Sequence, residues 1–195
     1  MPSPQDSANN KGDDLIKPNL DDTSAFSYLK VDELFPPDRD YPSNYPLNFH
    51  QVNEWLYRGG RPNRNDMTFL VEKDIQTVVS LRRPGAEISQ EEQIVLDMGR
   101  HFVAIPLSYW SLPTLKQVET FMEILDDVSR RPVYVHCYHG VDRTGFCIAM
   151  YRIMRCGWTY SQAYDEMRRM GHHRFTTAHY RYALWLLDRK LRKAK

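Results

Sequence analysis

A cysteine and an arginine six residues apart frame the part of this sequence that is best suited to chemistry. The stretch from His136 to Gly145 reads His-Cys-Tyr-His-Gly-Val-Asp-Arg-Thr-Gly. An apolar run at 132–135 precedes it and an apolar helical pattern from Phe146 follows it, which predicts a strand, a tight loop and a helix. The backbone N–H groups of such a loop and the positive end of the helix dipole both favour an anion at one point.

Two side chains give this loop its expected chemistry. Cys137 lies in the field of the loop and helix, so we expect its thiol to ionise below the ordinary pKa of about 8.5 and to act as a nucleophile. Arg143 offers a planar fork that fits two phosphate oxygens. Together they predict transfer of a phosphoryl group to cysteine and then to water. The alternative is a buried cysteine and a surface arginine beside an ordinary turn, which would not need the flanking histidine, glycine and Thr-Gly.

The stretch resembles the HCxxGxxR[ST]G signature of the cysteine-dependent protein tyrosine and dual-specificity phosphatase superfamily. The resemblance extends over about 53–171. Tyr57–Pro62 is similar to the "YRSGQP" turn of small bacterial and fungal dual-specificity phosphatases, and Ser80–Arg82 is similar to their "NLR" strand end. It implies a hydrolase that works through a phosphocysteine intermediate and needs neither a metal nor a cofactor. Phosphatase-like inositol polyphosphatases (phytases) share a valine where Val141 stands.

The resemblance also implies roles for the remaining loop residues. His136 is expected to orient the loop and to help keep the thiolate, and the hydroxyl of Thr144 to ease departure of the sulfur in the second step. Gly140 allows a backbone conformation that a side chain would resist. The residues expected to bind phosphate through the loop are Tyr138, His139, Gly140 and Val141.

The usual proton donor of this superfamily is missing from its usual place. Most members carry an aspartate on the loop after the preceding strand, whereas here 106–114 reads Pro-Leu-Ser-Tyr-Trp-Ser-Leu-Pro-Thr. Protonation of a leaving group is typically worth about 10²–10⁴ in rate. We expect Asp142 to be the general acid, since similar "DRT" endings occur in myotubularin-like and Sac-like phosphatases. The alternatives are that Asp142 only ties the loop to a neighbouring arginine, or that Glu87 or Asp40 is the acid.

Cations and aromatic residues near the loop bear on the substrate. Each arginine taken singly fits an ordinary ion pair, but as a set the cations favour phosphorylated inositols, either soluble inositol polyphosphates or phosphoinositides. Tyr109 and Trp110 could instead wall a slot for phosphotyrosine. The cations expected to contact substrate are Arg61, Arg82, Lys116 and Arg174.

Two further functions stay open at this point. RNA 5′-triphosphatases of capping systems carry a similar HCxHGxxRTG loop, and a non-catalytic phosphate-binding module is the alternative from another class. The formal net charge of +1 predicts no strong general attraction to nucleic acid. No segment approaches the roughly 18 apolar residues of a membrane span. We therefore expect a phosphorylated small molecule or a phosphoprotein as partner, without nucleic acid or stable membrane insertion, and leave the oligomeric state open.

Alternating strand and helix patterns predict an α/β fold: a compact, mostly parallel sheet with helices on both faces, and the phosphate-binding loop between a central strand and a helix. The domains expected are a polar N-terminal tail at 1–24, an extended Pro-rich segment at 25–52 and a phosphatase domain at 53–195. The expected strands span 53–58, 75–81, 101–107 and 133–136. The expected helices span 64–73, 89–99, 114–129, 144–156, 161–170 and 176–192.

Three cysteines do not suggest a disulfide framework, and a catalytic thiolate must stay reduced. The first residues, Met-Pro-Ser-Pro-Gln, lack the charged head and apolar run of a signal peptide. The cytoplasm is therefore the default compartment, while export after removal of a signal peptide stays open.

Overall fold

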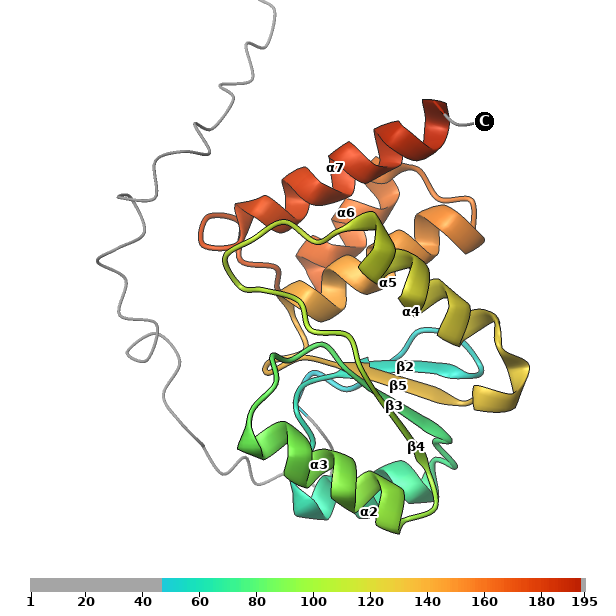
Figure 1. The fold of residues 1–195 in the computed structure, drawn as a ribbon. Coiled ribbons are helices and arrows are strands. Elements are labelled where there is room, and N and C mark those ends of the chain that lie inside the picture. The colour runs from blue at the N-terminus through green and yellow to red at the C-terminus, as the bar shows by residue number, and fades with distance from the viewer. Residues whose placement is uncertain (1–46, 194–195) are drawn as a thin grey trace, which may run out of the picture. The chain divides into compact units, whose positions relative to one another are not determined.

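The computed structural model describes residues 47–193 (Figure 1). The expected tail at 1–24, nearly all of the Pro-rich segment at 25–52 and the alternative acid Asp40 lie outside the described residues. The last part of that segment, 47–52, contains a two-residue strand that the sequence did not predict. No helix in the described range is long and apolar enough to span a membrane.

The centre of the domain is a five-stranded sheet with the order β1-β2-β5-β3-β4. Strands β2, β5, β3 and β4 are parallel, and β1 pairs with β2 antiparallel. The expected mostly parallel sheet is therefore confirmed, with β5 at its centre. His136, the last residue of β5, lies opposite Gly59 and Ser80, so three strands end level at the edge where the loop begins. The strands are β1 (His50–Gln51), β2 (Leu56–Gly59), β3 (Thr77–Ser80), β4 (His101–Ala104) and β5 (Val133–His136).

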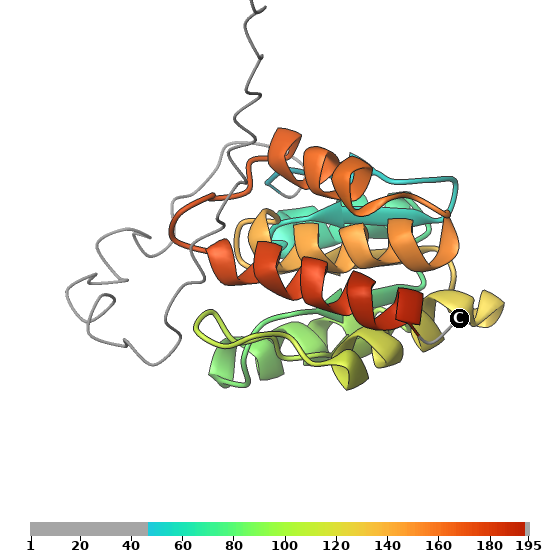
Figure 2. The same cartoon turned by 90° about the horizontal axis from the view of Figure 1, so that it is seen from above.

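Helices cover both faces of this sheet (Figures 1 and 2). One face carries α2 (Arg64–Glu72) and α3 (Ala86–Asp97). The other face carries the remaining four helices, and a short 3₁₀ helix, η2 (Val128–Arg130), follows α4. The four helices are α4 (Leu115–Asp126), α5 (Asp142–Arg155), α6 (Tyr160–Arg169) and α7 (Ala178–Lys193).

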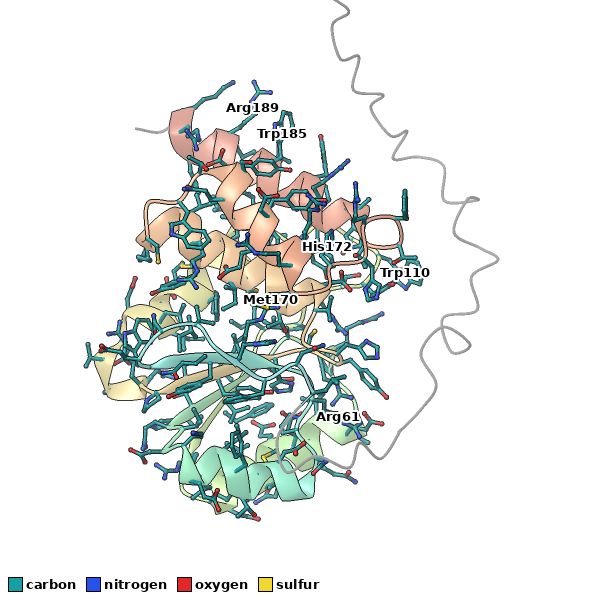
Figure 3. All side chains as sticks on the ribbon, turned by 180° about the vertical axis from the view of Figure 1, so that it is seen from behind. Arg61, Trp110, Met170, His172, Trp185 and Arg189 are labelled. Atoms are coloured by element: carbon teal, nitrogen blue, oxygen red, sulfur yellow. The ribbon has the colours of Figure 1, made fainter. Side chains whose placement is uncertain are left out.

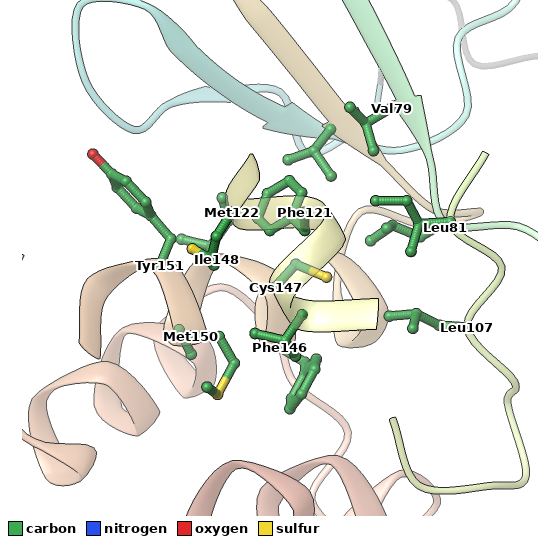
Figure 4. Packing of buried hydrophobic residues seen from close by; sticks show 14 of the residues in the cluster. Val79, Leu81, Leu107, Phe121, Met122, Phe146, Cys147, Ile148, Met150 and Tyr151 are labelled. Carbon is green, nitrogen blue, oxygen red and sulfur yellow. The ribbon is translucent and has the colours of Figure 1, made fainter. Parts of the chain in front are cut away.

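Strands β3 and β5 are buried on both faces, as continuous apolar runs predict, whereas the outer strand β4 is partly exposed. Side chains alternate along a strand, so Val79 joins the larger core under α4 and α5 while Val78 joins the smaller core under α2 and α3. Figure 4 shows the larger core, to which Phe121 of α4, Phe146 of α5 and Val79 of β3 all belong. This packing fixes β5 and α5, the two elements that hold the loop between them.

Two helix ends differ from the sequence prediction. The predicted start of a helix at Ser89 was wrong: α3 begins at Ala86, so that Ile88 lies in its first turn and is buried. The cap of α4 by Thr114 is confirmed as a capping box. However, α4 ends at Asp126, and Val128, expected to face inward, is 70% exposed in the following 3₁₀ turn. The other helices begin within two residues of expectation.

Candidate active site

The loop between β5 and α5 is built on a close approach between two backbone segments. Gly140 has a φ of +73°, in the left-handed region that glycine tolerates. A Cβ at Gly140 would lie 2.3 Å from the carbonyl carbon of Gly59 and 2.5 Å from the nitrogen of Gly60. The loop can therefore rest on the end of β2 only because glycine stands at this position.

Three consecutive carbonyl groups of the loop accept hydrogen bonds from the chain around β1 and β2. Because C=O and the following N–H point in opposite directions across a trans peptide, the N–H groups of the next residues face the other way, away from β2. The segment thus forms a row of N–H donors suited to phosphate oxygens. The pairs are Arg61 N–H to Tyr138 O at 2.9 Å, Asn48 Nδ2 to His139 O at 2.8 Å and Arg58 Nη2 to Gly140 O at 2.8 Å.

Cys137 is buried at the start of this loop and carries a perturbed thiol. Burial alone would raise its pKa, but four groups act in the opposite direction. The charge of Arg143, the hydroxyl and N–H of Thr144 and the N–H of Gly140 together hold the pKa of Cys137 below its ordinary value. A thiolate is the nucleophilic form of cysteine, so the loop favours nucleophilic attack.

Arg58 is a site residue that the sequence analysis did not single out. Its side chain is only 2% exposed, and its Nη2 donates to Gly140 O. Burial lowers the pKa of this guanidinium, while the charges of Glu166 and Cys137 act to raise it. Because a buried charge is costly without a counter-charge, the Cys137 thiolate helps to balance Arg58. An arginine among the apolar residues of a predicted strand was the available signal.

His136 is buried behind the loop and has two close polar neighbours. Its Nε2 lies 2.6 Å from Oε1 of Glu91, and its Nδ1 lies 3.1 Å from the carbonyl oxygen of Cys137. The ring also stacks on Tyr134, with 5.6 Å between centroids. His136 is therefore placed to orient the loop from below. Glu91, which comes from α3, was not predicted, and its spacing from the loop gave no signal.

Asp142, the expected general acid, is held by four hydrogen-bond donors from the chain between α6 and α7. Burial acts to raise its pKa, but the hydrogen bonds from His172, Thr177 and His173 outweigh it and hold the pKa well below the ordinary range. The carboxyl is thus an anion at neutral pH and is tied to the chain that precedes α7. The donors are His172 Nδ1 at 2.7 Å, His173 N–H at 3.0 Å, His173 Nδ1 at 2.8 Å and Thr177 Oγ1 at 2.6 Å.

The aromatic residues of the loop at 106–114 lie on the Asp142 side. Burial raises the pKa of Tyr109, and the hydroxyl of Thr176 and the charges of Asp142 and Arg143 also act on it. Its ring meets that of Trp110 edge-on, with centroids 4.9 Å apart, and Trp110 is 49% exposed. An aromatic wall beside the loop, as expected, is therefore compatible with the structure.

Of the four cations expected to contact substrate, the structure brings two to the loop. The guanidiniums of Arg61 and Arg82 lie 5.6 and 5.7 Å from the ring centroid of Tyr138. Lys116 and Arg174 are exposed, and within residues 47–193 neither makes an ion pair or a hydrogen bond to the loop. Figure 3 places Arg61 at the same end of the sheet as His172.

His139 does not add a cation at neutral pH. Burial lowers its pKa, the charges of His173 and Arg143 lower it further, and only Asp142 opposes them.

The remaining titratable groups offer no metal site: within the described range, no three His, Cys, Asp or Glu side chains are placed to hold a metal ion.

Comparison with known proteins places this geometry in a family. The family model described as "DSP-PTPase phosphatase fused to NAD+ Kinase" matches residues 40–182. The dual specificity protein phosphatase TpbA of Pseudomonas aeruginosa (strain UCBPP-PA14) is 32% identical over 132 residues, 64% of this chain and 55% of the relative. Inositol diphosphatase DSP1 of Oryza sativa subsp. japonica is 27% identical over 137 residues, 65% of this chain and 58% of the relative. The chain thus spans little more than half the length of these two relatives.

Solved structures agree on the fold. The core catalytic domain of the PP-IP phosphatase SIW14 from S. cerevisiae has a TM-score of 0.65 at 20% identity, covering 77% of this chain and 91% of that one. P. aeruginosa TpbA has a TM-score of 0.61 at 24% identity, covering 74% and 91%. The family match extends over most of the chain and includes the whole loop. The chain therefore belongs to the DSP-PTPase phosphatase family, within the cysteine-dependent dual-specificity phosphatases.

Proposed function

We propose that this protein is a cysteine-dependent phosphatase that removes the outer phosphate of a diphosphate group on a phosphorylated inositol. The nucleophile, the row of N–H donors and the arginine fork support phosphoryl transfer. Two similar proteins, the rice inositol diphosphatase and the yeast PP-IP phosphatase, are named for substrates of this class. Phosphorylated inositols are also the class that the cations near the loop favour.

Two displacements make up the reaction. The Cys137 thiolate attacks phosphorus, forming an S–P bond while the P–O bond to the leaving group breaks and its oxygen departs with the electron pair. Arg143 and the loop N–H groups hold the three equatorial oxygens. A water molecule then attacks phosphorus and the S–P bond breaks. Thr144 stabilises the departing thiolate with its hydroxyl, and inorganic phosphate leaves.

The observation that carries the choice of substrate is the state of the nearby carboxyl groups. Asp142 is held as an anion by its four donors. A hydrogen bond from Arg82 lowers the pKa of Glu87, and this outweighs its slight burial, with Arg61 adding to the effect. Neither group is poised to deliver a proton. We therefore assign Asp142 as a positioning residue that fastens the loop to the chain before α7.

A diphosphate bond fits a site in which the two described candidate acids, Asp142 and Glu87, are both held as anions. A departing phosphate group has a second pKa of about 6 and is stable as an anion at neutral pH. An inositol alkoxide is far more basic and needs a proton as it leaves, which is the step that general acids accelerate by about 10²–10⁴. The site therefore suits cleavage between two phosphates better than cleavage of a ring ester.

Phosphotyrosine is the second candidate, because Tyr109 and Trp110 stand beside the loop. Its phenolate leaving group, with a conjugate-acid pKa of about 10, is more basic than a departing phosphate and less basic than an inositol alkoxide. A triphosphate-ended RNA shares the diphosphate chemistry and is distinguished from an inositol by the rest of the molecule.

A leaving-group series tests the proposal. Phosphate release is measured from aryl phosphates of graded phenol pKa, and from a diphosphoinositol, inositol hexakisphosphate, a phosphoinositide, a phosphotyrosine peptide and triphosphate-ended RNA. We expect 4-nitrophenyl phosphate to exceed phenyl phosphate by about 100-fold or more, and the diphosphoinositol to lead the panel. The control, Cys137→Ser, should abolish every reaction. Equal rates across the aryl phosphates would reveal a general acid. Faster phosphate release from the phosphotyrosine peptide or the RNA than from the diphosphoinositol would reject the inositol substrate.

A further inference from the structure

We propose that Arg61 and Arg82 form a second anion subsite beside the catalytic loop, and that Glu87 occupies it until a second phosphate of the substrate displaces the carboxylate. This inference deepens the proposed function, because it applies to a substrate that carries several phosphates. It assigns a role to a charge cluster that the two displacement steps do not use.

Backbone hydrogen bonds hold Arg61, and the residue before Arg82, against the loop and the end of β5. The N–H of Arg61 donates to Tyr138 O at 2.9 Å, and Arg82 follows Leu81, whose N–H donates to His136 O at 2.8 Å. One arginine leaves the end of β2 and the other the end of β3, which are the two strands that flank β5. Both guanidiniums therefore reach the same rim of the loop.

The side chain of Tyr138 gives these two cations a common neighbour. Both guanidinium carbons lie within 6 Å of its ring centroid, at 5.6 Å and 5.7 Å. Attraction to the ring face offsets part of the repulsion between two like charges. Since Tyr138 immediately follows the nucleophile, an anion held by Arg61 and Arg82 would lie beside the phosphate in the loop.

One carboxylate oxygen of Glu87 fills the position between the arginines. Oε2 lies 3.0 Å from Nη1 of Arg61 and also contacts Nη2 of Arg82. A single oxygen shared by two guanidiniums is the arrangement that a phosphate oxygen would adopt. The carboxylate thus stands in for a phosphoryl oxygen of the ligand.

Glu87 is able to leave this position, whereas the neighbouring Glu91 is not. Glu87 belongs to the first turn of α3 and is 59% exposed, and ion pairs of such exposed groups contribute little. Glu91 is buried between His136 and Arg82, at 2.6 Å and 3.6 Å, and keeps its place. A phosphate group carries more charge and more acceptor oxygens than a carboxylate, so it should win the exchange.

This exchange would make the subsite selective for ligands with several phosphates. Inorganic phosphate fills only the catalytic loop and leaves Glu87 in place. A ligand such as inositol hexakisphosphate reaches both positions and must displace the carboxylate. Removing the negative charge of Glu87 should therefore strengthen binding of inositol hexakisphosphate more than binding of inorganic phosphate.

Calorimetry in a Cys137→Ser background tests this without requiring turnover. Dissociation constants of inorganic phosphate and inositol hexakisphosphate are compared for Glu87→Gln, for Arg61→Gln and for a control, Glu92→Gln, an exposed glutamate on the same helix. We expect Glu87→Gln to raise the preference for inositol hexakisphosphate by about two- to fivefold, and Arg61→Gln to lower it.

Two results would overturn the subsite. One is an equal change in preference for Glu87→Gln and Glu92→Gln, which would reflect net charge alone. The other is unchanged preference in Arg61→Gln. Because binding is read without catalysis, a protein that binds as expected but fails to cleave a diphosphoinositol would reject the proposed function and leave the subsite standing.

Discussion

Replacing Asp142 by asparagine removes one negative charge beneath the phosphate loop while nearly preserving its shape. The carboxylate accepts four hydrogen bonds of 2.6–3.0 Å from His172, His173 and Thr177. A hydrogen bond to a charged group contributes about 1.5–3 kcal/mol and a neutral one about 0.5–1.5 kcal/mol. The difference is about 1 kcal/mol for each bond. Since His173 is half exposed, we expect the variant to lose about 2–4 kcal/mol of unfolding free energy at neutral pH.

The pH dependence of this loss follows from the sign of the pKa change. The pKa of Asp142 is lower in the folded protein than in the unfolded chain, where it is about 3.9. Its contribution to stability is therefore fully present above about pH 5 and disappears as the pH falls through about 4 and below. Urea denaturation of wild type and Asp142→Asn should give a gap in unfolding free energy that is present at pH 5 and above and shrinks at lower pH.

Kinetics of the same variant separate an anchor from an acid. If Asp142 fastens the loop, kcat/KM should fall by a similar factor for 4-nitrophenyl phosphate and phenyl phosphate. If it donates the proton, the loss should be confined to the poor leaving group and reach about 10²–10⁴. Unchanged stability together with a loss restricted to phenyl phosphate would refute the anchoring role.

Three further perturbations probe the loop and its surroundings. Gly140→Ala should lower kcat/KM by about 100-fold or more, since its Cβ would lie 2.3 Å from a backbone carbon of β2. The control Gly157→Ala has φ +71° and open space around it, so it should cost only about 1–2 kcal/mol of stability; equal losses of kcat/KM in the two variants would contradict the close approach. Arg58→Met should raise the pKa of the Cys137 thiol and lower its alkylation rate by iodoacetamide at pH 6 by about tenfold, and Arg58→Lys should restore part of the rate. An unchanged pH dependence of alkylation in folded Arg58→Met would show that Arg58 does not stabilise the thiolate. Burial lowers the pKa of His179 to about 4, so the unfolded state binds more protons between about pH 6.5 and 4, and stability should fall as the pH is lowered through that range, by about 3 kcal/mol at most and less after solvent screening. His179→Gln should flatten this part of the plot of unfolding free energy against pH, and parallel plots for the two proteins would exclude a contribution from His179.

The sequence predicted the framework of the site because its signals are local. The apolar run of β5, the glycine of the loop and the helical pattern of α5 are contiguous, so strand, loop and helix could be assigned together. Apolar runs buried on both faces likewise predicted the parallel sheet. The start of α3 was missed because a capping pattern at Ser89 competed with burial of Ile88, and packing decided the outcome.

The parts that could not be predicted depend on contacts between distant segments. Arg58 meets Gly140 across 82 positions, and Glu91 reaches His136 from α3, a separate helix of the chain. The partners of Asp142 could not be named from the sequence, because its hydrogen-bond donors come from the chain before α7 and not from a neighbouring arginine. No local sequence pattern encodes such pairings. The role of a polar residue in this site could therefore be assigned only once its contacts in the folded protein were known.

The most direct test of the account is the product formed from one substrate, a diphosphoinositol that carries both a diphosphate group and ring monophosphates. Wild-type protein and Cys137→Ser would be incubated with it, and the products separated by charge. We predict release of the outer phosphate alone. The reaction should stop at the product in which every remaining phosphate is a monophosphate on the ring, and Cys137→Ser should release nothing. Removal of ring phosphates at a comparable rate would contradict this prediction, because the site would then supply a proton to the leaving group although Asp142 and Glu87 are held as anions.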